Sequence, residues 1–167
     1  SPKTTVYANR PIVSSRLQQQ SQSSNSSQVY YFEVTVLAPL PKATVEMAIG
    51  LFSTVGSFGA WPGEVSNSIG WGSEGLQVNG GRFDPNASSI IQFRNGDVIG
   101  CGIEVGGLQR VFFTLNGSIP VPPSINTSFP HGSCFPVVSF RDGKGHVLKA
   151  NFGLDPSVPF RWEGHNI

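Results

Sequence analysis

The chain has 167 residues, enough for one domain with a substantial hydrophobic core. Only 13% of the residues are charged and the formal net charge is +1, so we expect no basic face that would attract a nucleic acid. No apolar run approaches the roughly 20 residues that a membrane-spanning helix needs, and no direct membrane insertion by this segment is expected.

Glycine and proline predict an all-β fold. The 20 Gly and 13 Pro residues interrupt the chain too often for long helices and suit many short strands joined by turns. We therefore expect a β-sandwich or jelly roll.

The first strand is predicted over residues 4–8, and a loop follows at residues 9–12. Pro11 restricts Arg10 to an extended conformation. Residues 14–28 are nearly pure Ser, Gln and Asn, a composition too polar to bury, so they predict a flexible inserted loop.

Residues 29–37 and 44–52 alternate apolar side chains at every second position, the period of a strand with one buried face. Glu33 and Glu46 are interpreted as solvent-side strand residues. The side chains predicted to point into the core are Tyr30, Phe32, Val34 and Val36 in the first strand, and Val45, Met47, Ile49 and Leu51 in the second.

A long Gly-rich loop is predicted over residues 53–67, with Trp61-Pro62-Gly63 at its centre. Two short strands, residues 68–72 and 76–78, follow it around a turn. Trp71 lies inside the first of these strands and is expected in the core rather than in a binding site.

The most strongly specified region is predicted to be residues 94–117. Ile99, Cys101, Ile103 and Val105 share one strand face, and Val111, Phe113 and Leu115 resume the same period after Gly106-Gly107. The opposite face carries Val98, Gly100, Gly102 and Glu104, which favours a close neighbour or solvent there. Asn116-Gly117 predicts a second tight turn leading into a third strand.

The last strands are predicted over residues 134–140 and 146–152, joined as a hairpin, with an extended and packed tail at residues 154–162. Cys101 and Cys134 both lie among apolar strand residues and read as reduced core thiols. A disulfide between them stays open, because it requires Cα atoms within about 7 Å.

Catalysis is not expected. No pair of carboxylates lies in a motif and no G-x-S-x-G elbow is present. His131, His146 and His165 are scattered among turn residues without ligand spacing, so we expect no metal and no cofactor.

With the strands placed, the chain resembles a SPRY domain, of the type in Ran-binding-protein-M-like scaffolds and in fungal membrane-anchored ubiquitin-ligase adaptors. The resemblance covers about residues 7–153 and rests on nine segments in the family's order: NRPI, VYYFEVTV, MAIGL, WPG, SIGWGSEG, NGDVIGCGIE, VFFTLNG, FPVVSF and KANFG. At SIGWGSEG the chain lacks the aromatic and histidine residues (as in YHGDDG) of many relatives, so their binding specificity does not transfer.

The resemblance implies a bent, two-sheet antiparallel β-sandwich of the concanavalin-like jelly-roll kind, with residues 1–167 as a single domain. It also implies a non-catalytic module that binds a peptide segment or protein partner through loops at one edge, as the substrate-recruiting part of a scaffold or ubiquitin-ligase adaptor. As an isolated domain it is expected to be monomeric and cytoplasmic, with a lumenal or secreted location as alternatives.

The loops that carry ligand contacts in the family correspond here to residues 9–12, 57–64, 70–77 and 140–144. Trp61 is the leading candidate, either as a large rigid contact for a partner or as a loop residue folded over the edge of the core. The predicted partner-binding residues are Asn9, Arg10, Pro11, Ile12, Phe58, Trp61, Trp71, Glu74, Gln77, Phe140, Arg141 and Asp142.

A secreted, lectin-like carbohydrate-binding jelly roll is the alternative. Trp61 and Trp71 could stack on a sugar, and the chain has glycosylation sequons at Asn25, Asn86, Asn116 and Asn126. A Ser-rich chain also generates such sequons by chance.

Overall fold

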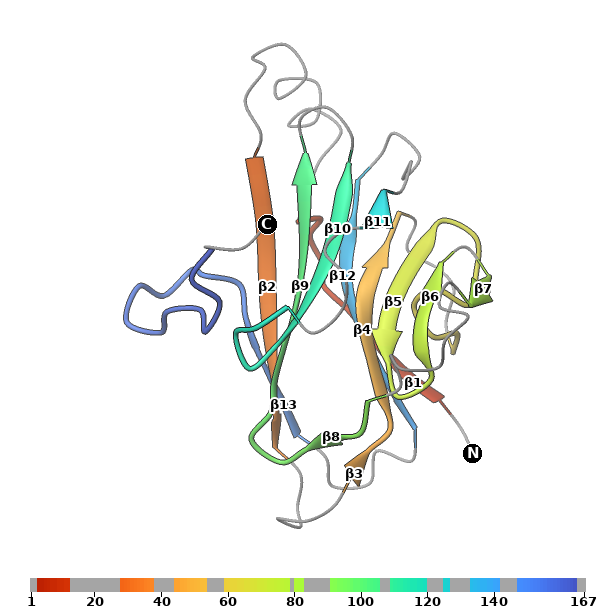
Figure 1. Ribbon diagram of the computed structural model, residues 1–167, viewed down its shortest axis with the longest axis horizontal. Helices are drawn as coiled ribbons and strands as arrows, with labels where there is room; N and C mark the ends of the chain where they lie inside the picture. Colours follow the sequence, from red (N-terminus) through yellow and green to blue (C-terminus); the bar gives the residue numbers. More distant parts are fainter. Residues whose placement is uncertain are drawn as a thin grey trace.

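The computed structural model describes residues 3–12, 28–37, 44–53, 59–78, 80–82, 91–105, 109–119, 125–126, 133–141 and 147–164. Within these residues the regular structure is entirely strand, without a helix. The strands form two antiparallel sheets and one small two-stranded sheet (Figure 1). The prediction of an all-β, two-sheet antiparallel architecture is therefore confirmed.

The larger sheet has six strands in the order β1-β12-β4-β5-β6-β7. Its strands are β1 (Lys3–Tyr7), β4 (Met47–Phe52), β5 (Ser68–Gly72), β6 (Gly75–Val78), β7 (Gly81–Arg82) and β12 (Phe135–Arg141).

The second sheet has five strands in the order β11-β10-β9-β2-β13. Its strands are β2 (Gln28–Leu37), β9 (Val98–Val105), β10 (Arg110–Leu115), β11 (Ile125–Asn126) and β13 (Val147–Asn151). The two-stranded sheet joins β3 (Thr44–Val45) to β8 (Phe93–Arg94).

The core lies between the two large sheets and is made of the side chains that alternate along each strand. Trp71 is fully buried there, and its ring centroid lies 5.7 Å from Phe93 and 5.9 Å from Phe113. The predicted inward faces of β2, β4, β9 and β10 all contribute to this cluster. The strand phases inferred from the sequence are therefore correct.

One predicted connection is wrong. β12 and β13 do not form a hairpin, because β12 pairs with β1 and β4 while β13 pairs with β2 in the other sheet. Adjacency in sequence suggested this pairing, whereas burial against distant strands decided the partners. The Asn116-Gly117 turn forms as predicted, with φ values of 52° and 85°, and β11 follows it as a third strand that pairs antiparallel with β10.

Cys101 and Cys134 are buried free thiols. Burial raises the pKa of both, that of Cys134 to about 12, which keeps the thiols protonated and unreactive.

Glycines on the outward faces of both sheets let another part of the chain approach closely. A Cβ added at Gly70 in β5 would lie 2.2 Å from the carbonyl oxygen of Pro62, and one at Gly102 in β9 would lie 2.1 Å from the ring of Phe112. The first close approach seats the loop that carries Trp61. The second seats an aromatic surface under the C-terminal segment, residues 152–164.

Candidate functional site

The predicted site residues fall into two separate groups. β1 runs antiparallel to β12, so Lys3 pairs with Arg141 at one end. Past the other end of β1, the amide of Ala8 donates to the carbonyl of Pro136. Arg141 lies five positions along β12 from Pro136, which is roughly 17 Å. The loop of residues 9–12 and the Trp61–Arg141 region therefore do not converge on one end of the sandwich.

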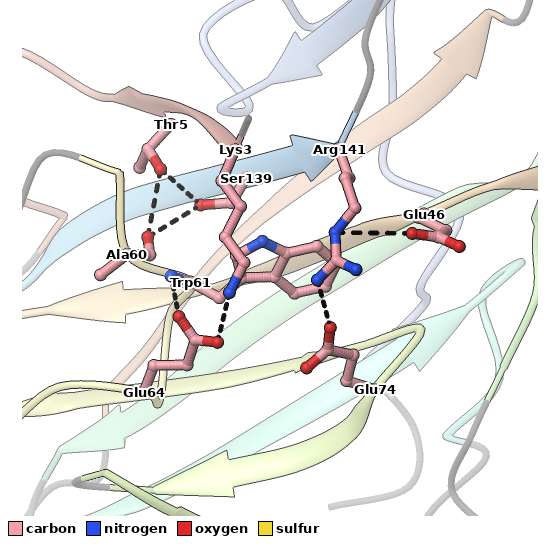
Figure 2. Close-up of polar contacts among 9 residues, drawn as sticks. All are labelled: Lys3, Thr5, Glu46, Ala60, Trp61, Glu64, Glu74, Ser139 and Arg141. Atoms are coloured by element: carbon pink, nitrogen blue, oxygen red, sulfur yellow. Dashed lines mark hydrogen bonds and ion pairs between the residues drawn. The ribbon is translucent and has the colours of Figure 1, made fainter. Parts of the chain in front are cut away.

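Trp61 is buried, with 1% of its surface exposed. Lys3 Nζ lies 5.3 Å and Arg141 Cζ lies 5.5 Å from the centroid of its ring, and Figure 2 shows the two cationic side chains beside the indole. Such cation–π contacts add modest stability. Of the two interpretations of Trp61, this burial supports the residue folded over the sheet.

Three carboxylates surround the cations beside Trp61. Glu64 pairs with Lys3, while Arg141 has its Nη2 2.6 Å from Glu74 Oε1 and its Nε 3.6 Å from Glu46 Oε2. These side chains are partly exposed, and ion pairs of that kind each contribute about 0–1 kcal/mol. We call Lys3, Glu46, Trp61, Glu64, Glu74 and Arg141 the Trp61 cluster.

Hydrogen bonds fix the loop beneath these charges. The hydroxyl groups of Thr5 and Ser139 donate to the carbonyl of Ala60 at 3.1 and 3.3 Å. The amide of Trp61 donates to Glu64 Oε2 at 2.9 Å. These contacts hold Ala60 and Trp61 against β1 and β12, so the Trp61 cluster forms a structural cap on the six-stranded sheet.

Glu64 should make the stability of this cap depend on pH. Burial alone would raise its pKa, but the hydrogen bonds from Lys3 and the Trp61 amide and the charges of Lys3 and Arg141 outweigh burial, so the pKa lies below its usual 4.5. When folding lowers the pKa of a carboxyl group, that group stabilises the fold at pH values above its pKa in the unfolded chain. The stabilisation disappears as pH falls through its lower pKa in the folded protein.

As pH falls from 5 to about 3, we expect the melting temperature of Glu64→Gln to drop less than that of the wild-type protein. Lys3→Gln should reduce the drop similarly, since it removes both a hydrogen bond and a charge that lower the pKa. Thermal melts across this range test the expectation, and identical slopes in all three proteins would contradict it.

The second group forms a groove of about 740 Å³ with a mainly apolar lining. One wall is the loop of residues 9–12, where Arg10 is exposed and makes no hydrogen bond or ion pair with any residue that the structure describes. The other wall is the C-terminal segment, in which Phe152 is 42% and Leu154 is 89% exposed. We call this the Arg10 groove.

The remaining predicted site residues lie as follows. Asn9 and Pro11 are exposed in the Arg10 groove and Ile12 is half-buried there. Trp71 belongs to the core, as expected, and Phe140 packs partly against it. Phe58, Asp142 and the side chain of Gln77 lie outside the described residues.

Sequence reasoning missed Glu33. It was expected on the solvent side, but it is 3% exposed and accepts hydrogen bonds from the hydroxyl of Tyr31 and from the backbone amides of Arg161 and Trp162. The alternation in β2 placed it correctly on the outward face. Only the fold shows that the C-terminal segment covers that face.

The part of the chain that the structure describes contains no group of three or more His, Cys, Asp or Glu side chains arranged to hold a metal ion. Within the same residues, no helix has the length and apolar character needed to cross a membrane.

Comparison with known proteins agrees with this architecture. A human SPRY domain of known crystal structure superposes with a TM-score of 0.60 at 24% identity, covering 93% of this chain and 88% of that one. The SPRY domain of human HERC1 gives a TM-score of 0.61 at 14% identity, covering 93% and 86%. No curated protein sequence matches. The SPRY domain family model matches residues 29–155, most of the chain. This chain therefore belongs to the SPRY domain family.

Proposed function

We propose that the domain is a non-catalytic interaction module that binds a short, partly apolar peptide segment carrying an acidic side chain, in the Arg10 groove. SPRY domains are in general protein-interaction modules without catalytic activity, which supports the class of function. The proposal adds the location and the chemistry of the ligand.

The observation that carries the proposal is an exposed, unpaired guanidinium beside an apolar groove. Arg10 offers five donors that match a carboxylate, and no described residue makes a hydrogen bond or ion pair with it; Glu163 also lines the groove. Phe152 and Leu154 expose apolar surface across the groove, which a bound side chain would remove from water. Grooves of this size with an apolar lining and few polar groups are typical of ligand sites.

We further infer that the domain recruits its partner within a larger scaffold or ubiquitin-ligase adaptor, in the cytoplasm, with residues 1–167 acting as one domain. The support for this is the resemblance of the sequence to Ran-binding-protein-M-like scaffolds and membrane-anchored adaptors. A preformed groove of this kind would bind with roughly micromolar affinity, about 8 kcal/mol.

The lectin alternative receives no support from the positions of its stacking residues. Trp61 and Trp71 expose 1% and 0% of their surfaces, so neither indole face is available to a sugar ring.

The test is selection of binders from a library of fluorescent peptides, followed by affinity measurements with variants. We expect Arg10→Ala to weaken the selected acidic peptides at least 10-fold, which is about 1.4 kcal/mol, with an unchanged melting temperature because the side chain is exposed. Leu154→Ser should also weaken binding, since it removes apolar surface from the opposite wall.

Arg94→Ala is the matched control. Arg94 is also exposed, but it belongs to β8 and does not line the Arg10 groove. Equal affinities for the Arg10 and Arg94 variants would place the binding surface elsewhere on the domain.

A further inference from the structure

The outward face of the five-stranded sheet carries an aromatic platform made by Tyr31 and Phe112. Their rings are nearly parallel, at 6°, with centroids 5.9 Å apart. Glycines on β9 make room for them: a Cβ at Gly100 would lie 1.9 Å from the Tyr31 hydroxyl oxygen, and one at Gly102 would lie 2.1 Å from the Phe112 ring. This accounts for the glycine-rich face of β9.

Two aromatic side chains of the C-terminal segment sit on this platform. The centroid of the Trp162 ring lies 4.7 Å from that of Tyr31 and 4.9 Å from that of Phe112. Phe160 meets Tyr31 edge-on at 5.0 Å. Such aromatic pairs contribute about 0.5–1.5 kcal/mol each beyond the burial of their area.

Between these rings, Glu33 binds the backbone of the same segment. Its carboxylate accepts from the amide of Arg161 at 2.9 and 3.0 Å and from the amide of Trp162 at 3.1 Å. The Tyr31 hydroxyl donates to the same carboxylate at 2.9 Å. The buried carboxylate of Glu33 thus binds two successive backbone amides of the segment. The platform contacts the aromatic rings of Phe160 and Trp162.

The connection to β13 allows the segment to leave without disrupting a sheet. Residues 153–159 are exposed, and their hydrogen bonds are local, such as that from the Val158 amide to the Asp155 carbonyl. Among the strands that the structure describes, β13 is the last of its sheet, and its one partner is β2. Figure 1 shows the segment, in dark blue, looping out beyond β13.

We propose that the Tyr31–Phe112 platform and Glu33 form a peptide-binding site for an extended Phe-x-Trp segment. The chain's own residues 160–162 fill it in cis, and the same segment of a second copy of the chain can replace them. The family match ends at residue 155, so the occupant lies outside the matched region. The segment that binds is identical in both copies, which makes the exchange self-complementary. This site lies beneath the C-terminal segment, and it shares Tyr31, Phe160 and Trp162 with the lining of the Arg10 groove.

The test uses a fluorescein-labelled synthetic peptide of residues 152–164, FGLDPSVPFRWEG, and full-length protein. A tethered segment has an effective concentration in the millimolar range, so the wild-type protein should largely exclude the peptide. A Phe160→Ala/Trp162→Ala variant, whose own segment is weakened, should bind the peptide at least about 10-fold more tightly than wild type does. Fluorescence polarisation gives both affinities.

Two controls separate this site from other surfaces. The same peptide with alanine in place of Phe160 and Trp162 keeps both acidic residues. Its affinity for the double variant should be at least 10-fold lower than that of the intact peptide. Adding Glu33→Gln to the double variant should weaken the intact peptide by a similar factor, because the amide side chain offers one acceptor oxygen instead of two. Equal binding of the intact and alanine peptides, or equal binding to wild type and double variant, would overturn the proposal.

Hydrogen exchange on the wild-type protein covers the case in which the double variant does not fold. The amides of Arg161 and Trp162 should exchange faster than those paired between β2 and β9, because the segment opens by itself. If they exchange only with global unfolding, the segment is a fixed part of the fold and the proposal is wrong.

Discussion

Replacing Trp61 with alanine is expected to lower the free energy of unfolding by about 3–5 kcal/mol. The side chain is 1% exposed, and its removal would leave a cavity under Lys3 and Arg141 that the surrounding side chains fill only in part. Chemical denaturation of the wild-type and Trp61→Ala proteins measures the loss.

Trp61→Phe is the matched control for this prediction. The indole Nε1 has no hydrogen-bond partner among the described residues, so its removal sacrifices no hydrogen bond. Phenylalanine keeps an aromatic ring between the two cations and should cost clearly less, about 1–2 kcal/mol. A loss below about 1 kcal/mol for Trp61→Ala would mean that the indole is accessible at the surface in solution.

Gly70→Ala should also destabilise the domain strongly, by about 3 kcal/mol. In the middle of a strand this change would ordinarily be mildly stabilising, because alanine loses less backbone entropy on folding. Here the new Cβ would lie 2.2 Å from the carbonyl oxygen of Pro62. The obstacle is backbone, so the loop carrying Trp61 has to move away from the sheet, which is the costly form of overpacking.

Gly81→Ala tests whether the effect belongs to the site or to glycine substitution as such. Gly81 lies in β7 of the same sheet, and an added Cβ would approach only the Val78 carbonyl oxygen, at 3.8 Å. We expect a change within about 0.5 kcal/mol there. Equal melting temperatures for the Gly70 and Gly81 variants would show that the loop does not rest on β5.

Much of the core could be predicted from the sequence, because a strand repeats its side-chain direction every two residues. Phe32, Ile49, Ile103 and Val111 all lie on the faces that alternation predicts, and all are buried. The Asn116-Gly117 turn was also predictable, since its positive φ values favour those two residues. These features depend on neighbours a few positions away.

The candidate site was less predictable, because its side chains are covered by residues far away in the sequence. Arg10 was correctly predicted as a loop residue, and it remains a candidate for partner binding. Glu33 was expected at the surface, and Trp61 was expected either as a partner contact or folded over the edge of the core; both are buried. No pattern around either residue indicates this, because what covers them is remote: Lys3 and Arg141 for Trp61, and the C-terminal segment for Glu33.

The sequence by itself determined the all-β class, the inward face of each long strand and the SPRY resemblance, because these follow from short-range period and motif order. Only the tertiary structure decided which strands pair, as when β12 and β13 join different sheets, and what covers the two outward faces. Glycines leave space on both faces, but space does not specify its occupant. Which segment fills it depends on free energies of burial between residues more than a hundred positions apart, such as Glu33 and Arg161.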